Sequence, residues 1–229
     1  MPYDLVSFDL DGTLVDTAPD LHAATNHVLG QAGHAAVPGH ELRPYISFGS
    51  RRMIQRGLEL HGCRVVPAEL DTMFQALLAF YADNIAVDSR PYPHLEVVLD
   101  VLSGRGMRLA VCTNKVEGHS RKLLAALGLD ARFAAICGRD TFTVCKPDPG
   151  HLTGTIAQAG GDPRHAIMVG DSDTDVSTAR AAGIPVIGVT FGYTDVPMRD
   201  LRPDALIDHY AEFGAALDDV SRRAGWPSA

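Results

Sequence analysis

The stretch that decides the fold is DLVSFDLDGTL, residues 4–14. Its first half is a short apolar run with β-branched and aromatic residues, about as long as a buried strand. The run ends in Asp9 and Asp11, which are two residues apart, so their side chains point to the same side of an extended chain. Gly12 permits a sharp turn directly after them. We therefore expect a strand that carries a pair of carboxylates at its end.

Similar apolar runs recur along the chain, and helical patterns lie between most of them. The runs occupy residues 108–113, 133–138, 166–170, 185–189 and, more weakly, 204–207. Strands that alternate with helices are typical of a mostly parallel sheet covered on both faces. The fold class predicted is therefore α/β, with a doubly wound, mostly parallel sheet.

Residues 15–85 interrupt this alternation because they contain only helical signals. Apolar residues recur there at helical spacing in three sets, the last of which runs from Leu70 to Tyr81. The proline-rich segment 88–93 then has the composition of a linker. We expect two domains: a core formed by residues 1–14 plus 86–229, and an all-helical domain, residues 15–85, inserted after the first strand.

Composition and charge exclude several classes of protein. The 20 Lys and Arg residues are outnumbered by 28 Asp and Glu, which gives a formal net charge of −8. Sequence-independent nucleic-acid binding needs clustered positive charge, so we expect none. No apolar run reaches the roughly 18 residues of a membrane-spanning helix, and the four cysteines are scattered. We predict a cytoplasmic protein that binds neither nucleic acid nor membranes, as a monomer or homodimer.

Three further polar sets stand at the ends of predicted strands or in a loop before a predicted helix. They are Thr113-Asn114, Lys146 in KPDP (146–149), and Asp171 with Asp175 in GDSDTD (170–175). Each has an ordinary structural explanation when it stands alone: a loop, a surface lysine, or acidic residues that cap a helix. Together they indicate more, because the carboxyl ends of strands in an open parallel sheet share one crevice, where ligands bind.

The combined set meets the needs of phosphoryl transfer. Attack by one carboxylate on phosphate sets anion against anion and needs a divalent cation, which Asp171 is suited to ligate. The second carboxylate of the Asp9–Asp11 pair would handle protons, while hydroxyl, lysine and backbone N–H groups would hold the phosphate. A non-catalytic module that binds Mg²⁺ or phosphate stays open as an alternative, although it would need no second aspartate at position 11.

These motifs, in this order and spacing, resemble the haloacid dehalogenase-like superfamily over nearly the whole chain, and within it the phosphoglycolate phosphatase group. The resemblance implies a Rossmann-like core in which Asp9 is the nucleophile and Asp11 the general acid/base. It implies Mg²⁺ as cofactor, held by Asp9, the Asp11 carbonyl and Asp171, with Asp175 nearby. The groups implied to hold the phosphate are Gly12, Thr13, Thr113, Asn114 and Lys146.

The helical insert resembles the mobile cap of this superfamily, which contacts the part of the substrate that is not phosphate. SFGSRR, residues 47–52, stands where the family carries its specificity loop. Arg51 or Arg52 would pair there with a substrate carboxylate, and Lys115 would also meet the substrate. The resemblance implies 2-phosphoglycolate as the small phosphorylated substrate. A phosphatase of similar sugar phosphates and a phosphosugar mutase stay open as alternatives.

Overall fold

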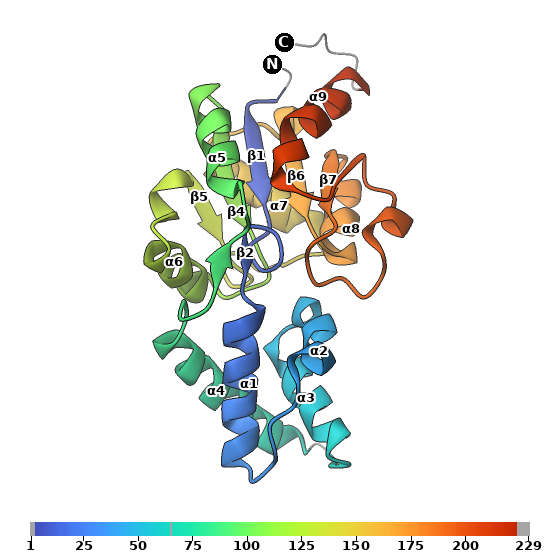
Figure 1. Cartoon of the computed structure of the whole chain (residues 1–229). Helices are drawn as coiled ribbons and strands as arrows, with labels where there is room; N and C mark the ends of the chain where they lie inside the picture. Colours follow the sequence, from blue (N-terminus) through green and yellow to red (C-terminus); the bar gives the residue numbers. More distant parts are fainter. Residues whose placement is uncertain (1–2, 65, 224–229) are drawn as a thin grey trace.

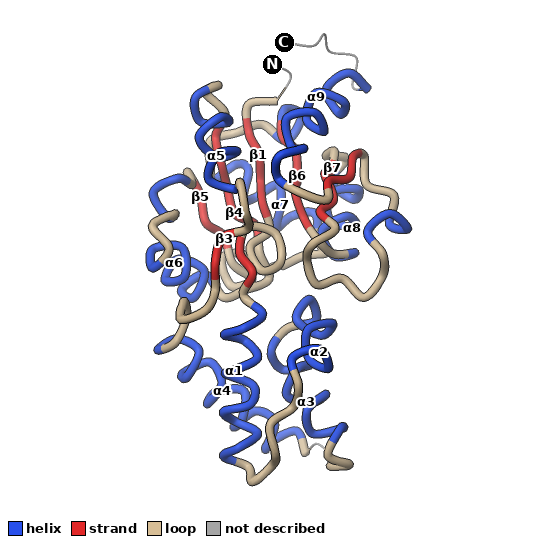
Figure 2. The backbone as a smooth tube through the Cα atoms, viewed as in Figure 1, coloured by secondary structure: helices blue, strands red, loops and turns tan. Residues whose placement is uncertain are grey.

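A computed structural model, which describes residues 3–64 and 66–223, shows one parallel sheet with helices on both faces (Figures 1 and 2). The sheet has the order β5-β4-β1-β6-β7-β8, and all neighbouring strands run parallel. Its strands are β1 (Leu5–Phe8), β4 (Arg108–Cys112), β5 (Ala135–Cys137), β6 (Ala166–Gly170), β7 (Val186–Val189) and β8 (Ala205–Ile207). The predicted doubly wound α/β fold is confirmed.

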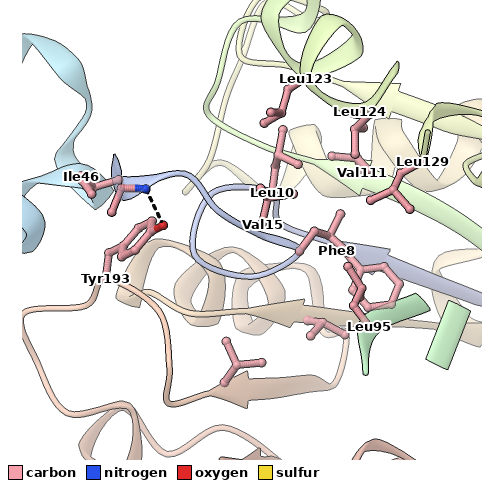
Figure 3. Close-up of a cluster of buried hydrophobic side chains, with 14 of the residues drawn as sticks. Phe8, Leu10, Val15, Ile46, Leu95, Val111, Leu123, Leu124, Leu129 and Tyr193 are labelled. Atoms are coloured by element: carbon pink, nitrogen blue, oxygen red, sulfur yellow. Dashed lines mark hydrogen bonds between the residues drawn. The ribbon is translucent and has the colours of Figure 1, made fainter. Parts of the chain in front are cut away.

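Two apolar layers sandwich the sheet, and the side chains of β1 alternate between them. Val6 and Phe8 pack with α5 (Leu95–Gly104), α6 (Glu117–Ala126) and α9 (Phe213–Arg223), and Figure 3 shows Phe8 beside Leu95 in this layer. Leu5 packs on the opposite face with α7 (Pro149–Gln158) and α8 (Asp173–Ala182). This alternation is the two-residue period of an extended chain, and it makes β1 a fully buried central strand.

The core also contains short 3₁₀ helices, and a helical insert lies outside it. The 3₁₀ segments of the core are η2 (Asp130–Arg132), η3 (Pro163–His165), η4 (Met198–Leu201) and η5 (Tyr210–Glu212). The insert comprises α1 (Ala18–Gln31), α2 (Gly39–Leu42), η1 (Arg43–Phe48), α3 (Ser50–Leu60) and α4 (Pro67–Asp83). Helix α1 packs against α3 and α4, and the group lies beyond the strand ends, at the bottom of Figure 1. Among the described residues, no helix is both long and apolar enough to cross a membrane.

The two connections to the insert form a small antiparallel ribbon. Strand β2 (Val15–Asp16) pairs with β3 (Arg90–Pro91). The expectation of helical structure from residue 15 onward is therefore wrong for Val15 and Asp16. Two chain segments that leave and re-enter the core side by side satisfy each other's backbone groups, and this overrides the local pattern.

Asp20, in the first turn of α1, joins this helix to the second connection, at residues 88 and 89. Its carboxylate accepts hydrogen bonds from the Asp88 N–H at 3.0 Å, the Ser89 N–H at 2.9 Å and the Ser89 hydroxyl at 2.6 Å. Asp20 and Ser89 are both buried. The proline-rich linker is therefore anchored to the helix that opens the insert.

Candidate active site

The four polar sets predicted from the sequence meet at one cavity of about 640 Å³. The cavity lies at the carboxyl ends of the strands around β1, where open parallel sheets bind ligands. Its lining from the core includes Asp9, Asp11, Thr113, Asn114, Lys115, Lys146 and Asp171. The insert closes the other side with residues of η1, α3 and α4, among them Phe48, Arg51, Phe74 and Tyr81.

Three carboxylates form the centre of this site. Asp9, Asp171 and Asp175 are buried, and each offers an oxygen within 4.8 Å of the others. The Lys146 ammonium lies 2.9 Å from Asp9 Oδ1 and donates a hydrogen bond of 2.5 Å to Asp175 Oδ1. Three buried carboxyl groups thus share one positive charge. An oxygen-lined cluster with more carboxyl groups than cations suits a hard divalent cation.

The electrostatics of the cluster show the same imbalance. Burial, followed by the charges of Asp175 and Asp11, raises the pKa of Asp9 to about 6 against the opposing effect of Lys146. Burial and the charges of Asp175 and Asp9 also raise the pKa of Asp171 well above its ordinary value. For Lys146, burial alone would lower the pKa, but the adjacent Asp175 and Asp9 carboxylates raise it. The lysine is therefore charged, while the carboxylates are costly as anions until another cation joins them.

Glycines let the backbone close tightly around these carboxylates. A Cβ atom at Gly12, where φ is +86°, would lie 2.4 Å from Asp171 Oδ2, and one at Gly192 would lie 2.2 Å from the same oxygen. A Cβ atom at Gly170 would lie 2.3 Å from that of Asp175. The donor set and the close-fitting backbone together fit a small hard ion such as Mg²⁺.

Hydrogen bonds fix Asp171 and Asp175 separately. Asp171, at the end of β6, accepts the Tyr193 N–H at 2.7 Å and the Thr13 hydroxyl at 3.3 Å. Asp175 closes the capping box of α8, because its Oδ2 accepts the N–H and the hydroxyl of Ser172 while its Oδ1 faces Lys146. The helix cap, one of the two roles that the sequence suggested for Asp175, is therefore present, and the same side chain also pairs with Lys146.

Lys146 is positioned by two neighbours. Its backbone N–H donates to His151 Nδ1 at 3.2 Å, and its carbonyl accepts from the Asn114 side-chain amide at 2.9 Å. The Asn114 amide is thus directed at the lysine backbone rather than presented freely to the cavity. Thr113 is buried beside it, and its hydroxyl accepts the Lys115 N–H at 3.2 Å.

Asp11 has its own partners at the cavity wall. Its Oδ1 accepts the Thr17 hydroxyl at 2.7 Å and the Lys115 ammonium at 3.0 Å. The Lys115 ammonium also lies 4.4 Å from the centroid of the Tyr81 ring, which belongs to α4 of the insert. Sequence reasoning missed Thr17 and Tyr81, because no local pattern links either residue to the aspartates of the first strand.

Comparison with known sequences agrees with this arrangement. The chain matches the haloacid dehalogenase-like hydrolase family over residues 6–189, a span that contains the whole carboxylate cluster and Lys146. The chain belongs to the haloacid dehalogenase-like hydrolase family.

Relatives of this hydrolase cover almost its full length. It is 48% identical over 224 residues to a protein of Mesorhizobium japonicum named phosphoglycolate phosphatase, and the matched segment covers 98% of this chain and 99% of the relative. It is also 48% identical to a phosphoglycolate phosphatase of Agrobacterium fabrum, over 93% of this chain and 91% of the relative. The crystal structure of a predicted phosphoglycolate phosphatase from Haemophilus somnus is similar with a TM-score of 0.86 and 29% identity, covering 93% and 97% of the two chains.

The two adjacent arginines of the hydrolase's insert differ in position. Arg51 lines the cavity, pairs with Asp71 and stacks on Phe74 at 4.8 Å from the ring centroid. Arg52 instead pairs with Glu59 at 2.7 Å and lies over the ring of Tyr45. Of the two predicted substrate contacts, the structure brings only Arg51 to the cavity.

Proposed function

We propose that this hydrolase is a Mg²⁺-dependent phosphatase that cleaves 2-phosphoglycolate through an aspartyl phosphate on Asp9. The observation that carries the proposal is the meeting of Asp9 with Lys146 and Asp171 in one buried cluster, although the last two lie far along the chain. The near full-length similarity to proteins named phosphoglycolate phosphatase supports this choice of substrate.

In this proposal residues 1–14 plus 86–229 form the catalytic core and residues 15–85 form a cap over the cavity; of these, residues 1–2, 65 and 224–229 lie outside the described part of the chain. The cap supplies one wall of the cavity, which supports a role in excluding water and in contacting the substrate. The four cysteines are free, which suits a reducing, cytoplasmic compartment.

Asp9, Asp171 and the Asp11 carbonyl would hold Mg²⁺, with Asp175 beside them. The ion, when bound, supplies positive charge to the nucleophile and to the phosphate oxygens. Lys146 adds a second positive charge next to Asp9. Asn114 and His151 hold the backbone of Lys146 in place. The Thr113 hydroxyl and the N–H groups of Gly12 and Thr13 are proposed to bind the phosphoryl oxygens.

The reaction then proceeds in two displacements at phosphorus. An Asp9 oxygen bonds to phosphorus while the bond to the glycolate oxygen breaks, and Asp11 gives a proton to that oxygen. Asp11, now a carboxylate, takes a proton from water as the water oxygen attacks phosphorus and the bond to Asp9 breaks. Inorganic phosphate leaves, and both aspartates return to their starting states. Thr17 and Lys115 orient the Asp11 side chain for both proton transfers.

Recognition of the substrate carboxylate is assigned to two of the cations that line the cavity. Lys115 approaches from the core and Arg51 from the cap. Their charge-assisted hydrogen bonds to a carboxylate would select a phosphorylated acid over a neutral phosphate ester.

A panel of phosphate esters tests the proposal. With Mg²⁺, we expect the highest kcat/KM for 2-phosphoglycolate, lower values for sugar phosphates, and no turnover in excess EDTA. Faster cleavage of a sugar phosphate would favour a sugar-phosphate phosphatase, and conversion of one sugar phosphate into its isomer would favour a mutase. Binding of Mg²⁺ without turnover of any ester would indicate a binding module, and full activity in excess EDTA would contradict the metal assignment.

A further inference from the structure

Tyr193, in the loop after β7, rests directly on the proposed cation ligand Asp171. Its backbone N–H donates to Asp171 Oδ2 at 2.7 Å. The preceding residue, Gly192, permits this approach, because a Cβ atom there would lie 2.2 Å from the same oxygen. The backbone at residues 192 and 193 is therefore packed closely against the Asp171 carboxylate.

The phenol of the same residue reaches the connection between the core and the insert (Figure 3). Its oxygen accepts the N–H of Thr17 at 2.6 Å and of Ala18 at 2.9 Å, and it donates to Asp16 at 2.6 Å. Thr17 stands at the N-cap of α1 but makes no side-chain cap, because its hydroxyl donates to Asp11. The phenol, with one donor and two acceptor positions, replaces the missing cap and is fully used.

The insert contacts Tyr193 by a second route. The Arg43 guanidinium of η1 lies 4.8 Å from the centroid of the Tyr193 ring. It also lies 3.6 Å from the Asp16 carboxylate, which accepts the hydrogen bond of the phenol. Tyr193 is only 2% exposed. Tyr193 thus joins three parts of the molecule: its backbone contacts the Asp171 carboxylate, its phenol contacts the entry to α1, and its ring contacts Arg43 of η1.

We infer that Tyr193 is a positioning residue that couples cation binding at Asp171 to the placement of the helical insert. This inference rests on the proposed function only in taking Asp171 as a ligand of a divalent cation. A cation that holds Asp171 also holds the backbone at Tyr193. Through the phenol it holds residues 16–18, which form the first of the two linkers between the core and the insert. Because linkage is reciprocal, a displaced linker weakens cation binding by the same factor.

Substitution Tyr193→Phe tests the coupling, because it keeps the ring and the backbone N–H and removes only the three phenol hydrogen bonds. Mg²⁺ binding is measured by calorimetry without substrate, and hydrogen exchange of the Thr17 and Ala18 amides is followed with and without Mg²⁺. In the wild type, Mg²⁺ should slow exchange at both amides. In the variant, we expect exchange to be on the order of 10-fold faster and insensitive to Mg²⁺, with Mg²⁺ affinity lowered about 5-fold or more.

Two further variants separate coupling from general loss of stability. Tyr210→Phe removes a buried phenol bond of 2.9 Å to the Thr13 carbonyl and leaves the linker contacts of Tyr193 intact, so it should keep the Mg²⁺ response of the linker. Arg43→Ala removes the second route and should weaken the response in part, which carries the test if Tyr193→Phe does not fold.

Two results would overturn the coupling while leaving the proposed function intact. One is Mg²⁺ binding to the wild type with unchanged exchange at Thr17 and Ala18. The other is a Tyr193→Phe variant that retains the full Mg²⁺ response. A wild type that shows the coupling but does not hydrolyse 2-phosphoglycolate would instead overturn the proposed substrate alone.

Discussion

Charged side chains are buried around Lys146 at the carboxyl ends of the strands, whereas the pair of Arg51 and Asp71 in the helical insert is exposed. At the sheet edge, the Lys146 side chain is 2% exposed and lies between two buried carboxylates. In the insert, Arg51 is 46% exposed, and its partner Asp71 is 61% exposed. The first arrangement cannot change without leaving a buried charge unpaired, whereas the second is an exchangeable surface pair worth at most about 1 kcal/mol.

This contrast separates chemistry from recognition. Phosphoryl transfer needs the nucleophile, the positive charges and the proton carrier in one geometry, and strand ends held by a buried core provide it. Recognition of the rest of a substrate needs only a cation that is free to change partner. Arg51 can leave Asp71 for a substrate carboxylate at little cost, while Lys146 has no comparable freedom.

Removal of the nucleophile is expected to give the largest effect. Asp9→Asn should lower kcat by on the order of 10⁴-fold or more while the protein stays folded, because the amide has the same shape but does not attack phosphorus. Steady-state kinetics and circular dichroism check both parts. The control Asp173→Asn changes an exposed aspartate at the start of α8 and should leave kcat within about 3-fold of wild type, as expected of a surface position. Turnover by Asp9→Asn near the wild-type rate would remove Asp9 from the mechanism.

Loss of the buried lysine should be smaller but should affect stability as well. Lys146→Met is expected to lower kcat/KM about 10³-fold, since it removes a positive charge beside the reacting groups. It should also lower the free energy of unfolding of the metal-free protein by about 3 kcal/mol, because Asp9 and Asp175 lose their partner. Urea unfolding with EDTA measures the second effect. Lys122→Met, at an exposed position of α6, should change neither quantity appreciably, and equal effects of the two substitutions would contradict the buried-charge explanation.

The two adjacent arginines offer a matched pair within the insert. Arg51→Ala should raise KM for 2-phosphoglycolate about 10-fold with little change in kcat, the size expected for one charge-assisted hydrogen bond. Arg52→Ala should change KM less than about 2-fold, because its side chain pairs with Glu59 away from the cavity. Equal effects of both substitutions on KM would contradict the assignment of Arg51, and not Arg52, to the substrate carboxylate.

The smallest expected effect concerns the pH dependence of stability. Burial, followed by the charge of Lys146, lowers the pKa of His151 to about 4. The unfolded imidazole takes up a proton below about pH 6.5, whereas the folded one stays neutral, so stability falls as the pH drops from that point toward 4. We expect a loss on the order of 1–2 kcal/mol between pH 7 and pH 5.

His151→Gln should lack this part of the pH dependence, as measured by urea unfolding at the two pH values. His40→Gln, at a side chain that is 79% exposed in the insert, should keep it. Parallel pH profiles for the wild type and His151→Gln would contradict the assignment.

The sequence was sufficient to predict the six-stranded fold and the meeting of its polar motifs. Each strand of the main sheet lies within an apolar run, and the rule that parallel strands end at one edge brings Asp9, Thr113 and Asp171 together. Lys146 and Asp175 follow from short motifs that precede helices. These predictions needed only local patterns and one rule about sheets.

Long-range partners explain what could not be predicted. Tyr193 lies in a loop without a recognisable motif, and its phenol bonds Asp16, 177 positions away. The ribbon of β2 and β3 likewise depends on two distant segments meeting. Arg51 and Arg52 are indistinguishable by type, and only the phase of α3, which begins at Ser50, decides which one faces the cavity, since neighbouring helix positions differ by about 100°.

The most direct test of the central claim is to look for phosphate on Asp9 during turnover. The enzyme is mixed with 2-phosphoglycolate and Mg²⁺, quenched in acid within the first turnovers, and its peptides are analysed by mass spectrometry. We predict one phosphoryl group on the peptide that contains Asp9, and none when EDTA is present or Asn replaces Asp9. Active hydrolysis of the substrate with an unmodified Asp9 peptide, or with phosphate on another residue, would contradict the account.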